Sequence, residues 1–160
     1  DQVAHQLEQA GVANYLVEVG GEMRLAGHSP RGDSWRIAIE RPDSQGRAMA
    51  RAIRVTDAAV ATSGDYRNFF EVAGVRYSHT IDPRDGLPVR HQLVSVTVVH
   101  PSAMLADAWA TALSVLGPKE GQAVAQRLGL AVYFMEREGA TLRSSHSEAF
   151  APYLEDEAGE

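Results

Sequence analysis

The stretch that decides the fold, residues 94–117, reads VSVTVVHPSAMLADAWATALSVLG. Its first six residues are almost continuously apolar, which predicts a buried strand over 94–99. After Ser102, a residue type that caps helices, apolar residues recur at helical spacing up to Leu116. The pair Gly117–Pro118 then interrupts the pattern and predicts a second helix that ends at residue 128. A strand followed by two helices is therefore the centre of the predicted fold.

The sequence on both sides of this centre predicts short strands joined by tight turns, after a first helix over 2–10. Alternating apolar residues flank glycine-containing turns, which is typical of hairpins. The predicted strands are 14–19, 22–26, 35–40, 52–56, 58–62, 69–72, 75–80, 94–99, 131–136 and 141–144. Strands in runs, then helices, then strands indicate an α+β fold with a mostly antiparallel sheet and packed helices. We expect one domain over 1–154 and a disordered acidic tail over 155–160.

Composition excludes several classes of protein. The 160 residues carry a net charge of −6, and their 15 Lys and Arg form no basic block of the kind that tracks nucleic-acid phosphates. The chain has no cysteine, which excludes a disulfide framework, a thiolate zinc site and a cysteine nucleophile. No apolar run approaches the roughly 18 residues that span a bilayer. We therefore expect a globular chain that does not bind nucleic acid.

The first predicted helix of the centre carries one charged residue, Asp107, among residues 103–117. Such a helix is expected to be buried on most sides. Its large apolar residues form one stripe, and Asp107 and Thr111 lie one turn apart on the opposite side. A carboxylate and a hydroxyl at this spacing suit a hard ion such as Mg²⁺. Alternatively, Asp107 caps a loop or pairs with an arginine, and Thr111 bonds back along its own helix. A buried carboxylate needs a partner under either interpretation.

A second cluster of reactive side chains lies in YSHTIDPRDG, residues 77–86. His79, at the end of a predicted strand, could serve as a general acid or base, and Arg84 could bind a phosphate bidentately. Alternatively, His79 closes the strand by hydrogen bonding. For Asp85–Gly86 we favour ordinary turn chemistry, and for Asp82 both interpretations stay open.

Four blocks in sequence order resemble the ApbE family of FAD:protein FMN transferases. They are ATSGDY at 61–66, RYSHTIDPRDGLPV at 76–89, SVTVV at 95–99 and ADAWATALSVLG at 106–117, and NYLVEVGGEMRLAG at 14–27 is also similar to the family. The resemblance implies an ApbE, T-fold-like architecture, of which this chain is a C-terminal part. The family's G-x-x-K-G-x-x-x-D segment is expected to end at Asp1, and we expect the chain alone to be inactive.

The resemblance also implies an activity. In this family a Mg²⁺-dependent enzyme splits FAD, releases AMP and joins FMN to a threonine of an acceptor flavoprotein, typically a subunit of a membrane redox complex. It implies a periplasmic or cell-envelope location, with a lipid anchor upstream of this chain. Two alternatives are a Mg²⁺-dependent FAD pyrophosphatase that gives FMN and AMP, and a non-catalytic flavin-binding or assembly module.

Motif by motif, the resemblance assigns roles to six residues. They are Asp107 and Thr111 as metal ligands, His79 as the catalytic acid or base, and Ser63, Ile81 and Arg84 as contacts of FAD. Two positions depart from the family pattern: Asp85 stands where threonine is usual, and Ala110 stands where some members carry a second acid. The second departure argues against a two-metal site.

Overall fold

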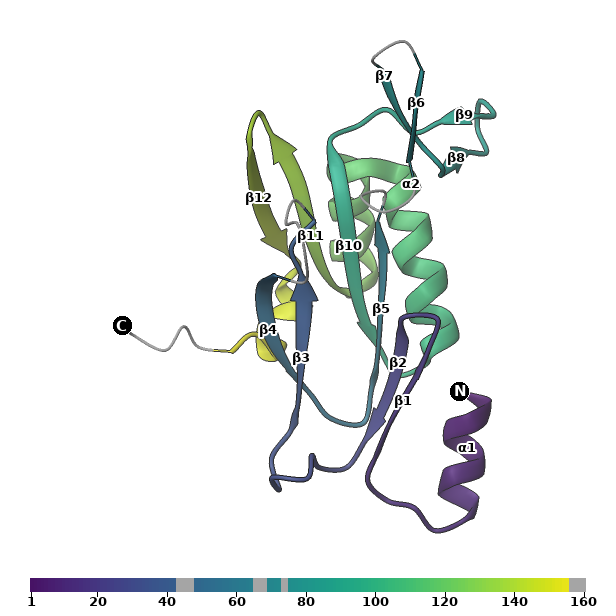
Figure 1. The fold of residues 1–160 in the computed structure, drawn as a ribbon, viewed down its shortest axis with the longest axis vertical. Coiled ribbons are helices and arrows are strands. Elements are labelled where there is room, and N and C mark those ends of the chain that lie inside the picture. Colours follow the sequence, from purple (N-terminus) through teal and green to yellow (C-terminus); the bar gives the residue numbers. More distant parts are fainter. Residues whose placement is uncertain (43–47, 65–68, 73–74, 156–160) are drawn as a thin grey trace.

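A six-stranded antiparallel sheet organises the computed structural model, which describes residues 1–42, 48–64, 69–72 and 75–155 (Figure 1). The strand order is β1-β2-β5-β10-β11-β12. The strands are β1 (Tyr15–Val19), β2 (Glu22–Ala26), β5 (Ala59–Gly64), β10 (Leu93–His100), β11 (Ala131–Glu138) and β12 (Thr141–His146). The predicted α+β class with a mostly antiparallel sheet is confirmed.

Three hairpins and three helical segments surround this sheet. The hairpins are β3 (Trp35–Glu40) with β4 (Met49–Val55), β6 (Phe69–Val72) with β7 (Val75–Ser78), and β8 (Ile81–Asp82) with β9 (Leu87–Pro88). The helical segments are α1 (Gln2–Gln9), α2 (Ala103–Leu128) and the 3₁₀ helix η1 (Glu148–Tyr153). The β8–β9 hairpin and η1 were not predicted. The predicted turn at 41–46 lies partly outside the described residues, and the predicted turn at 73–74 lies wholly outside them.

The centre of the sheet, at β10 and the first part of β11, is buried on both faces, which explains the continuous apolar run of β10. One face packs against α2 through Val96, Val98 and the ring of Phe134. The opposite face packs against β3, β4 and η1, where Phe150 is fully buried. Because successive side chains of a strand point to opposite faces, a strand covered on both sides is apolar at nearly every position.

The contact face of α2 is shifted from the predicted stripe of Leu105, Trp109, Ala112 and Leu116, of which Trp109 and Leu116 are partly buried against the core. Its buried residues include Ala106, Ala110 and Leu113, whereas Leu105 is 40% exposed. Small side chains allow the helix axis to approach the sheet closely, so the face with alanine is the one that packs. The expectation of a helix buried on most sides is therefore wrong for the first segment, one face of which, including Asp107 and Thr111, is exposed.

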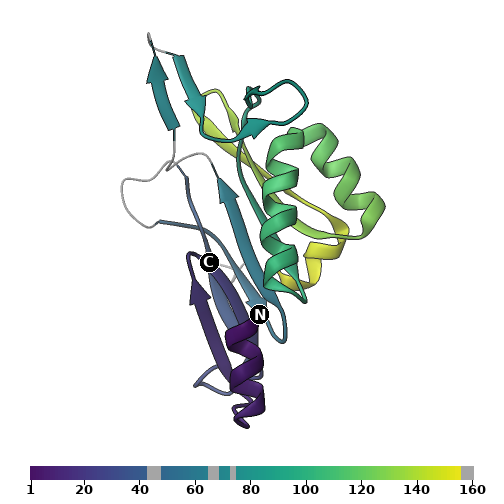
Figure 2. The same ribbon diagram turned by 90° about the vertical axis from the view of Figure 1, so that its right-hand side faces the viewer.

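The predicted break between two helices is confirmed at Gly117. Its backbone has φ 77° and ψ 179°, a conformation that is essentially restricted to glycine, and Pro118 opens the second segment. Figure 2 shows that the chain turns back on itself at this kink. A Cβ atom added at Gly117 would lie 2.6 Å from Cδ2 of His91. Both the backbone conformation and the contact therefore require glycine.

Replacing Gly117 by alanine is expected to destabilise the fold by about 2–3 kcal/mol, because the substitution combines backbone strain with a clash against the His91 ring. The matched control is Gly129→Ala at the end of α2, where φ is 64° and a Cβ would meet nothing within 4 Å. That change should cost about 1 kcal/mol. Urea unfolding of both variants measures the difference, and equal losses would contradict the role of the His91 contact.

Glu155, the last described residue, contacts arginines of the β3–β4 hairpin, and the predicted disorder of the tail over 155–160 stays a prediction. The Glu155 carboxylate accepts hydrogen bonds from Arg36 Nε at 2.8 and 2.9 Å, and it lies 3.2 Å from Arg54 Nε. Arg51 Nη2 also donates to the Glu155 carbonyl at 2.7 Å. These charges hold Glu155 against the β3–β4 hairpin, and residues 156–160 lie outside the described part. Across the described residues, none of the helices is long and apolar enough to cross a bilayer.

Candidate functional site

Asp107 and Thr111 occupy an exposed face of α2, one helical turn apart. Asp107 borders a groove of about 450 Å³ between the start of α2, helix α1 and the β1–β2 hairpin. The other lining residues are Asp1, Gln2, Val3, Val17, Val19, Glu22, Arg24, Ala103 and Met104. The carboxylate of Asp107 is therefore open to solvent and to a ligand, and the expectation that burial forces a partner on it is wrong.

The two oxygen groups of Asp107 and Thr111 suit an open magnesium site better than a metal centre enclosed by protein ligands. In the described part of the chain, no group of three or more His, Cys, Asp or Glu side chains is arranged to hold a metal. Mg²⁺ is commonly bound by one or two protein oxygens, with phosphate oxygens and water completing its shell. Asp107 and Thr111 supply that number and type of ligand, so the residues present are compatible with Mg²⁺ bound together with a phosphate-bearing substrate.

The candidate histidine lies directly after strand β7. His79 is exposed, whereas its neighbour Ser78 is buried and accepts a hydrogen bond at its Oγ from the Thr80 N–H at 3.1 Å. The bend that this bond stabilises turns the chain into β8. Ile81, the predicted FAD contact two residues later, is 48% exposed. An imidazole and an apolar side chain are thus both accessible at this corner.

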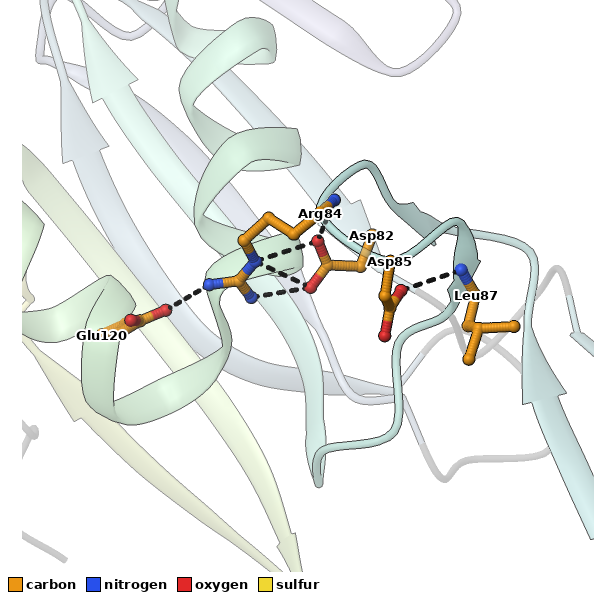
Figure 3. Close-up of polar contacts among 5 residues, drawn as sticks. All are labelled: Asp82, Arg84, Asp85, Leu87 and Glu120. Carbon is orange, nitrogen blue, oxygen red and sulfur yellow. Dashed lines mark hydrogen bonds and ion pairs between the residues drawn. The ribbon is translucent and has the colours of Figure 1, made fainter.

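Arg84 lies between two carboxylates (Figure 3). Its Nε and Nη2 donate to the Asp82 carboxylate at distances from 2.6 to 3.0 Å, and its Nη1 donates to Glu120 Oε2 at 2.9 Å. Glu120 belongs to the segment of α2 after the kink, so this network ties the histidine loop to the helix. The predicted role of Arg84 in binding FAD stays a prediction, and in this conformation its charge is matched by Asp82 and Glu120.

The turn interpretation of Asp85 and Gly86 is confirmed. Asp85 Oδ1 accepts a hydrogen bond from the Leu87 N–H at 2.8 Å, and Figure 3 shows its side chain turned toward that amide. Gly86 has φ 73°, and its N–H donates to the Asp82 carbonyl at 2.8 Å. Asparagine and aspartate commonly close turns in this way. The departure of Asp85 from the family pattern is therefore compatible with the same turn.

The pKa of the Asp82 carboxyl is lowered, mainly by the hydrogen bonds from the Arg84 side chain and next by the Arg84 backbone N–H. The hydrogen bonds to Asp82, and next the one to Glu120, raise the pKa of the Arg84 guanidinium. A lowered folded pKa means that Asp82 stabilises the loop at pH values above the unfolded pKa of about 3.9, and that this contribution is lost as the pH falls through the lower folded value.

We expect Arg84→Ala to raise the pKa of Asp82 toward its unfolded value, because the main cause of the shift is removed. A ¹³C NMR titration of the Asp82 carboxyl carbon in both proteins measures this pKa. Lys119→Ala, which removes an exposed cation near Glu120 in sequence, is the control and should leave the titration unchanged. The same midpoint in wild type and Arg84→Ala would contradict the assigned cause.

Ser63 lies on β5, partly exposed, opposite Val96 of β10. The neighbouring Thr62 forms a hydroxyl–hydroxyl hydrogen bond of 2.8 Å with Thr97, which holds the two strands together at this level. Asp65 and Tyr66, the end of the ATSGDY block, lie outside the described residues. The predicted contact of Ser63 with FAD stays a prediction.

The predicted site residues fall into two groups along α2 (Figures 1 and 2). Asp107 and Thr111 belong to the first part of α2, the start of which lies beside α1, and the histidine loop lies at the kinked end, where β8 contacts α2. Asp107 and Gly117 are ten residues apart, or about 15 Å along the helix axis. Thr111, six residues before Gly117, is the member of the pair that lies closer to the kink.

Sequence reasoning missed two residues in this region. Glu120 contacts Arg84 across 36 positions, and Asp1 contacts the start of α2 across about 100. Both are charged residues without a local motif, so no spacing in the sequence pointed to their partners. Two signals indicated that a carboxylate was needed: Arg84 in the loop, and the first turn of α2, which contains no acidic residue. Neither signal identified which carboxylate it was.

The antiparallel sheet, the kinked helix and the exposed oxygen pair define an α+β domain with a candidate metal face, and comparison with known proteins gives its family. The ApbE family model matches residues 1–134. The chain belongs to the ApbE family, which confirms the resemblance drawn from the four sequence blocks.

Curated relatives carry the name FAD:protein FMN transferase. The protein of Escherichia coli (strain K12) is 43% identical over 157 residues, which cover 98% of this chain and 45% of the relative. The protein of Vibrio cholerae serotype O1 is 46% identical over 154 residues, which cover 96% of this chain and 46% of the relative. The chain thus spans about half the length of the curated relatives that it matches.

Solved structures agree with the fold. The apo form of the flavinyl transferase ApbE from Pseudomonas stutzeri superposes with a TM-score of 0.85 at 45% identity, over 96% of this chain and 48% of that one. The flavin transferase ApbE from Vibrio cholerae gives a TM-score of 0.85 at 44% identity, over the same shares of the two chains. The architecture described here is therefore that of ApbE flavin transferases.

Proposed function

We propose that the protein containing this chain transfers the FMN part of FAD to a threonine of an acceptor protein and releases AMP. The observation that carries this proposal is the Asp107–Thr111 pair, which lies exposed on α2 in a chain of the ApbE family. The name of the relatives, FAD:protein FMN transferase, supports the substrate and the type of acceptor.

The reaction replaces a phosphoanhydride bond by a phosphoester bond. The threonine oxygen forms a bond to the phosphorus of the FMN part, the bond from that phosphorus to the AMP part breaks, and AMP leaves with the electron pair. The hydroxyl proton must be removed as the new bond forms, and His79 is the residue that we propose to accept it. Ser63, Ile81 and Arg84 would hold the flavin nucleotide.

Asp107 and Thr111 would hold Mg²⁺ through a carboxylate oxygen and a hydroxyl oxygen. When bound, the ion supplies positive charge that neutralises the diphosphate oxygens as negative charge shifts to the leaving AMP. The contribution of this chain is to fix both ligands on one helix, so that they are in place before the substrate arrives.

The proposed acceptor is a flavoprotein subunit of a membrane redox complex, and the proposed location is the periplasm or cell envelope, with a lipid anchor as the attachment to the membrane. The family resemblance supports both. Cell fractionation with an antibody against the protein tests the location, and recovery in the cytoplasmic fraction would overturn it.

The test of the activity is an incubation of the full-length protein with FAD, Mg²⁺ and an acceptor that bears the target threonine. A fluorescent flavin band on a denaturing gel at the mass of the acceptor, lost when EDTA is added, is the expected result. Free FMN and AMP with unlabelled acceptor would instead indicate a pyrophosphatase, and tight FAD binding without turnover would indicate a binding module. Either of these outcomes would overturn the proposal.

Replacing His79 by alanine is expected to slow transfer by about 10²–10⁴-fold, because the hydroxyl proton then has no positioned acceptor. A steeper rise of the remaining rate with pH should accompany the loss, since hydroxide replaces the imidazole. Initial rates of acceptor labelling between pH 6 and pH 9 measure both effects. The control is His28→Ala, an exposed histidine beyond strand β2, and a His79 variant with the rate of this control would contradict the assignment.

A further inference from the structure

The first turn of α2 depends on several partners for its hydrogen bonds. A helix leaves its first four backbone N–H groups without partners in the helix itself. The Ser102 N–H donates to Nδ1 of His100 at 3.0 Å, and the Leu105 N–H donates to the Ser102 hydroxyl at 3.4 Å. Two of the four donors are thus satisfied by residues next to the helix.

The other two donors bond to the side chain of Asp1. The Ala103 N–H donates to Oδ1 at 2.9 Å, and the Met104 N–H donates to Oδ2 at 3.1 Å. The Ser102 hydroxyl donates to Oδ2 as well, at 2.7 Å. One carboxylate from about 100 residues earlier therefore accepts three hydrogen bonds at the start of α2.

Asp1 does not use this carboxylate on its own helix. It is the N-cap of α1, where its carbonyl accepts the His5 N–H at 2.9 Å, but its side chain forms no capping bond there. A negative charge at a helix N-terminus is favourable because it meets the positive end of the helix dipole. The side chain is thus committed to α2.

Asp1 and Asp107 line the same groove, and Asp107 lies five residues after the Ser102 cap. We propose that Asp1 is a positioning residue, which fixes the first turn of α2 and thereby holds Asp107 and Thr111 in place for the metal. This inference rests on the proposed metal role of these two residues. Without Asp1, two backbone donors lose their acceptors, the first turn frays, and the carboxylate of Asp107 one turn later loses its fixed direction.

The first arm of the test needs no metal. Amide hydrogen exchange of Ala103, Met104 and Asp107 is followed by NMR in the full-length protein that contains this chain. Asp1→Ala should speed exchange about tenfold, and Asp1→Asn, which keeps one oxygen acceptor, should have a smaller effect. Gln2→Ala, one position along, is the matched control and should exchange like wild type. Unchanged exchange in Asp1→Ala would overturn the proposal.

The second arm measures metal affinity with Mn²⁺ alone, counted as the free ion by electron paramagnetic resonance. Asp107→Asn sets the background. Asp1→Ala should weaken Mn²⁺ binding about tenfold, and Asp1→Asn should restore part of the affinity. Faster exchange with wild-type affinity would make Asp1 a structural cap and overturn the positioning role. If wild type binds Mn²⁺ no better than Asp107→Asn, the metal role itself fails, and the exchange of the Asp107 amide alone then decides whether Asp1 fixes this turn.

Discussion

The Asp107→Asn protein is expected to transfer FMN at least about 100-fold more slowly than wild type, with the fold unchanged. The substitution keeps the shape of the side chain but removes the negative charge that would bind Mg²⁺, and loss of one such electrostatic group commonly costs about 10²–10³ in rate. Because the side chain is exposed, its stability cost should stay within about 0.5 kcal/mol. Initial rates of acceptor labelling, at an Mg²⁺ concentration that just saturates the wild type, measure the effect.

The control for Asp107→Asn is Glu138→Gln, which neutralises an exposed carboxylate at the end of β11. That variant should transfer FMN at the wild-type rate. Raising Mg²⁺ should recover part of the activity of Asp107→Asn, because Thr111 and the diphosphate oxygens remain. An Asp107→Asn rate within twofold of wild type would remove this residue from the site.

The largest effect on stability is expected from Phe134→Ala, at about 3–5 kcal/mol. The ring is fully buried in the face of the sheet that α2 covers, and Gly121 of the helix approaches it so closely that an added Cβ would lie 3.4 Å from Cε1. Removing the ring leaves a cavity under the second segment of α2. Because domains are stable by only about 5–15 kcal/mol, this loss is a large fraction of the total.

Urea unfolding monitored by circular dichroism measures the effect of Phe134→Ala. Leu128→Ala is the control, since this leucine at the end of α2 is 49% exposed and its truncation should cost no more than about 0.5 kcal/mol. Similar midpoints for the two variants would contradict the position of the core between α2 and the sheet.

Features set by neighbouring residues were predictable from the sequence. The Ser102 cap, the Gly117 break and the turn at Asp85–Gly86 follow from local backbone chemistry, and each is present in the structure. The buried strand β10 was also predictable, because a strand covered on both faces has few polar positions. The spacing of Asp107 and Thr111 on one helix is also a local feature that the sequence predicts.

Features set by packing between distant segments were not predictable. The contact face of α2 was only partly predicted, because large apolar residues were expected at its centre, whereas the small Ala106 and Ala110 permit the close approach. The contacts of Glu155 are with arginines of a distant hairpin, and the bond from Arg84 to Glu120 joins a loop to a helix. Such pairings depend on tertiary structure, and one sequence carries no local pattern for them.

In the proposed function, Asp107 and Thr111 hold the metal at which FAD is split. Anomalous diffraction at the manganese edge, from crystals of the full-length protein grown with FAD and Mn²⁺, tests it most directly. The predicted result is an anomalous peak within about 2.5 Å of one Asp107 carboxylate oxygen and of the Thr111 hydroxyl, with diphosphate oxygens completing the shell. A peak bound by other residues, or FAD bound with no peak beside Asp107, would contradict the claim.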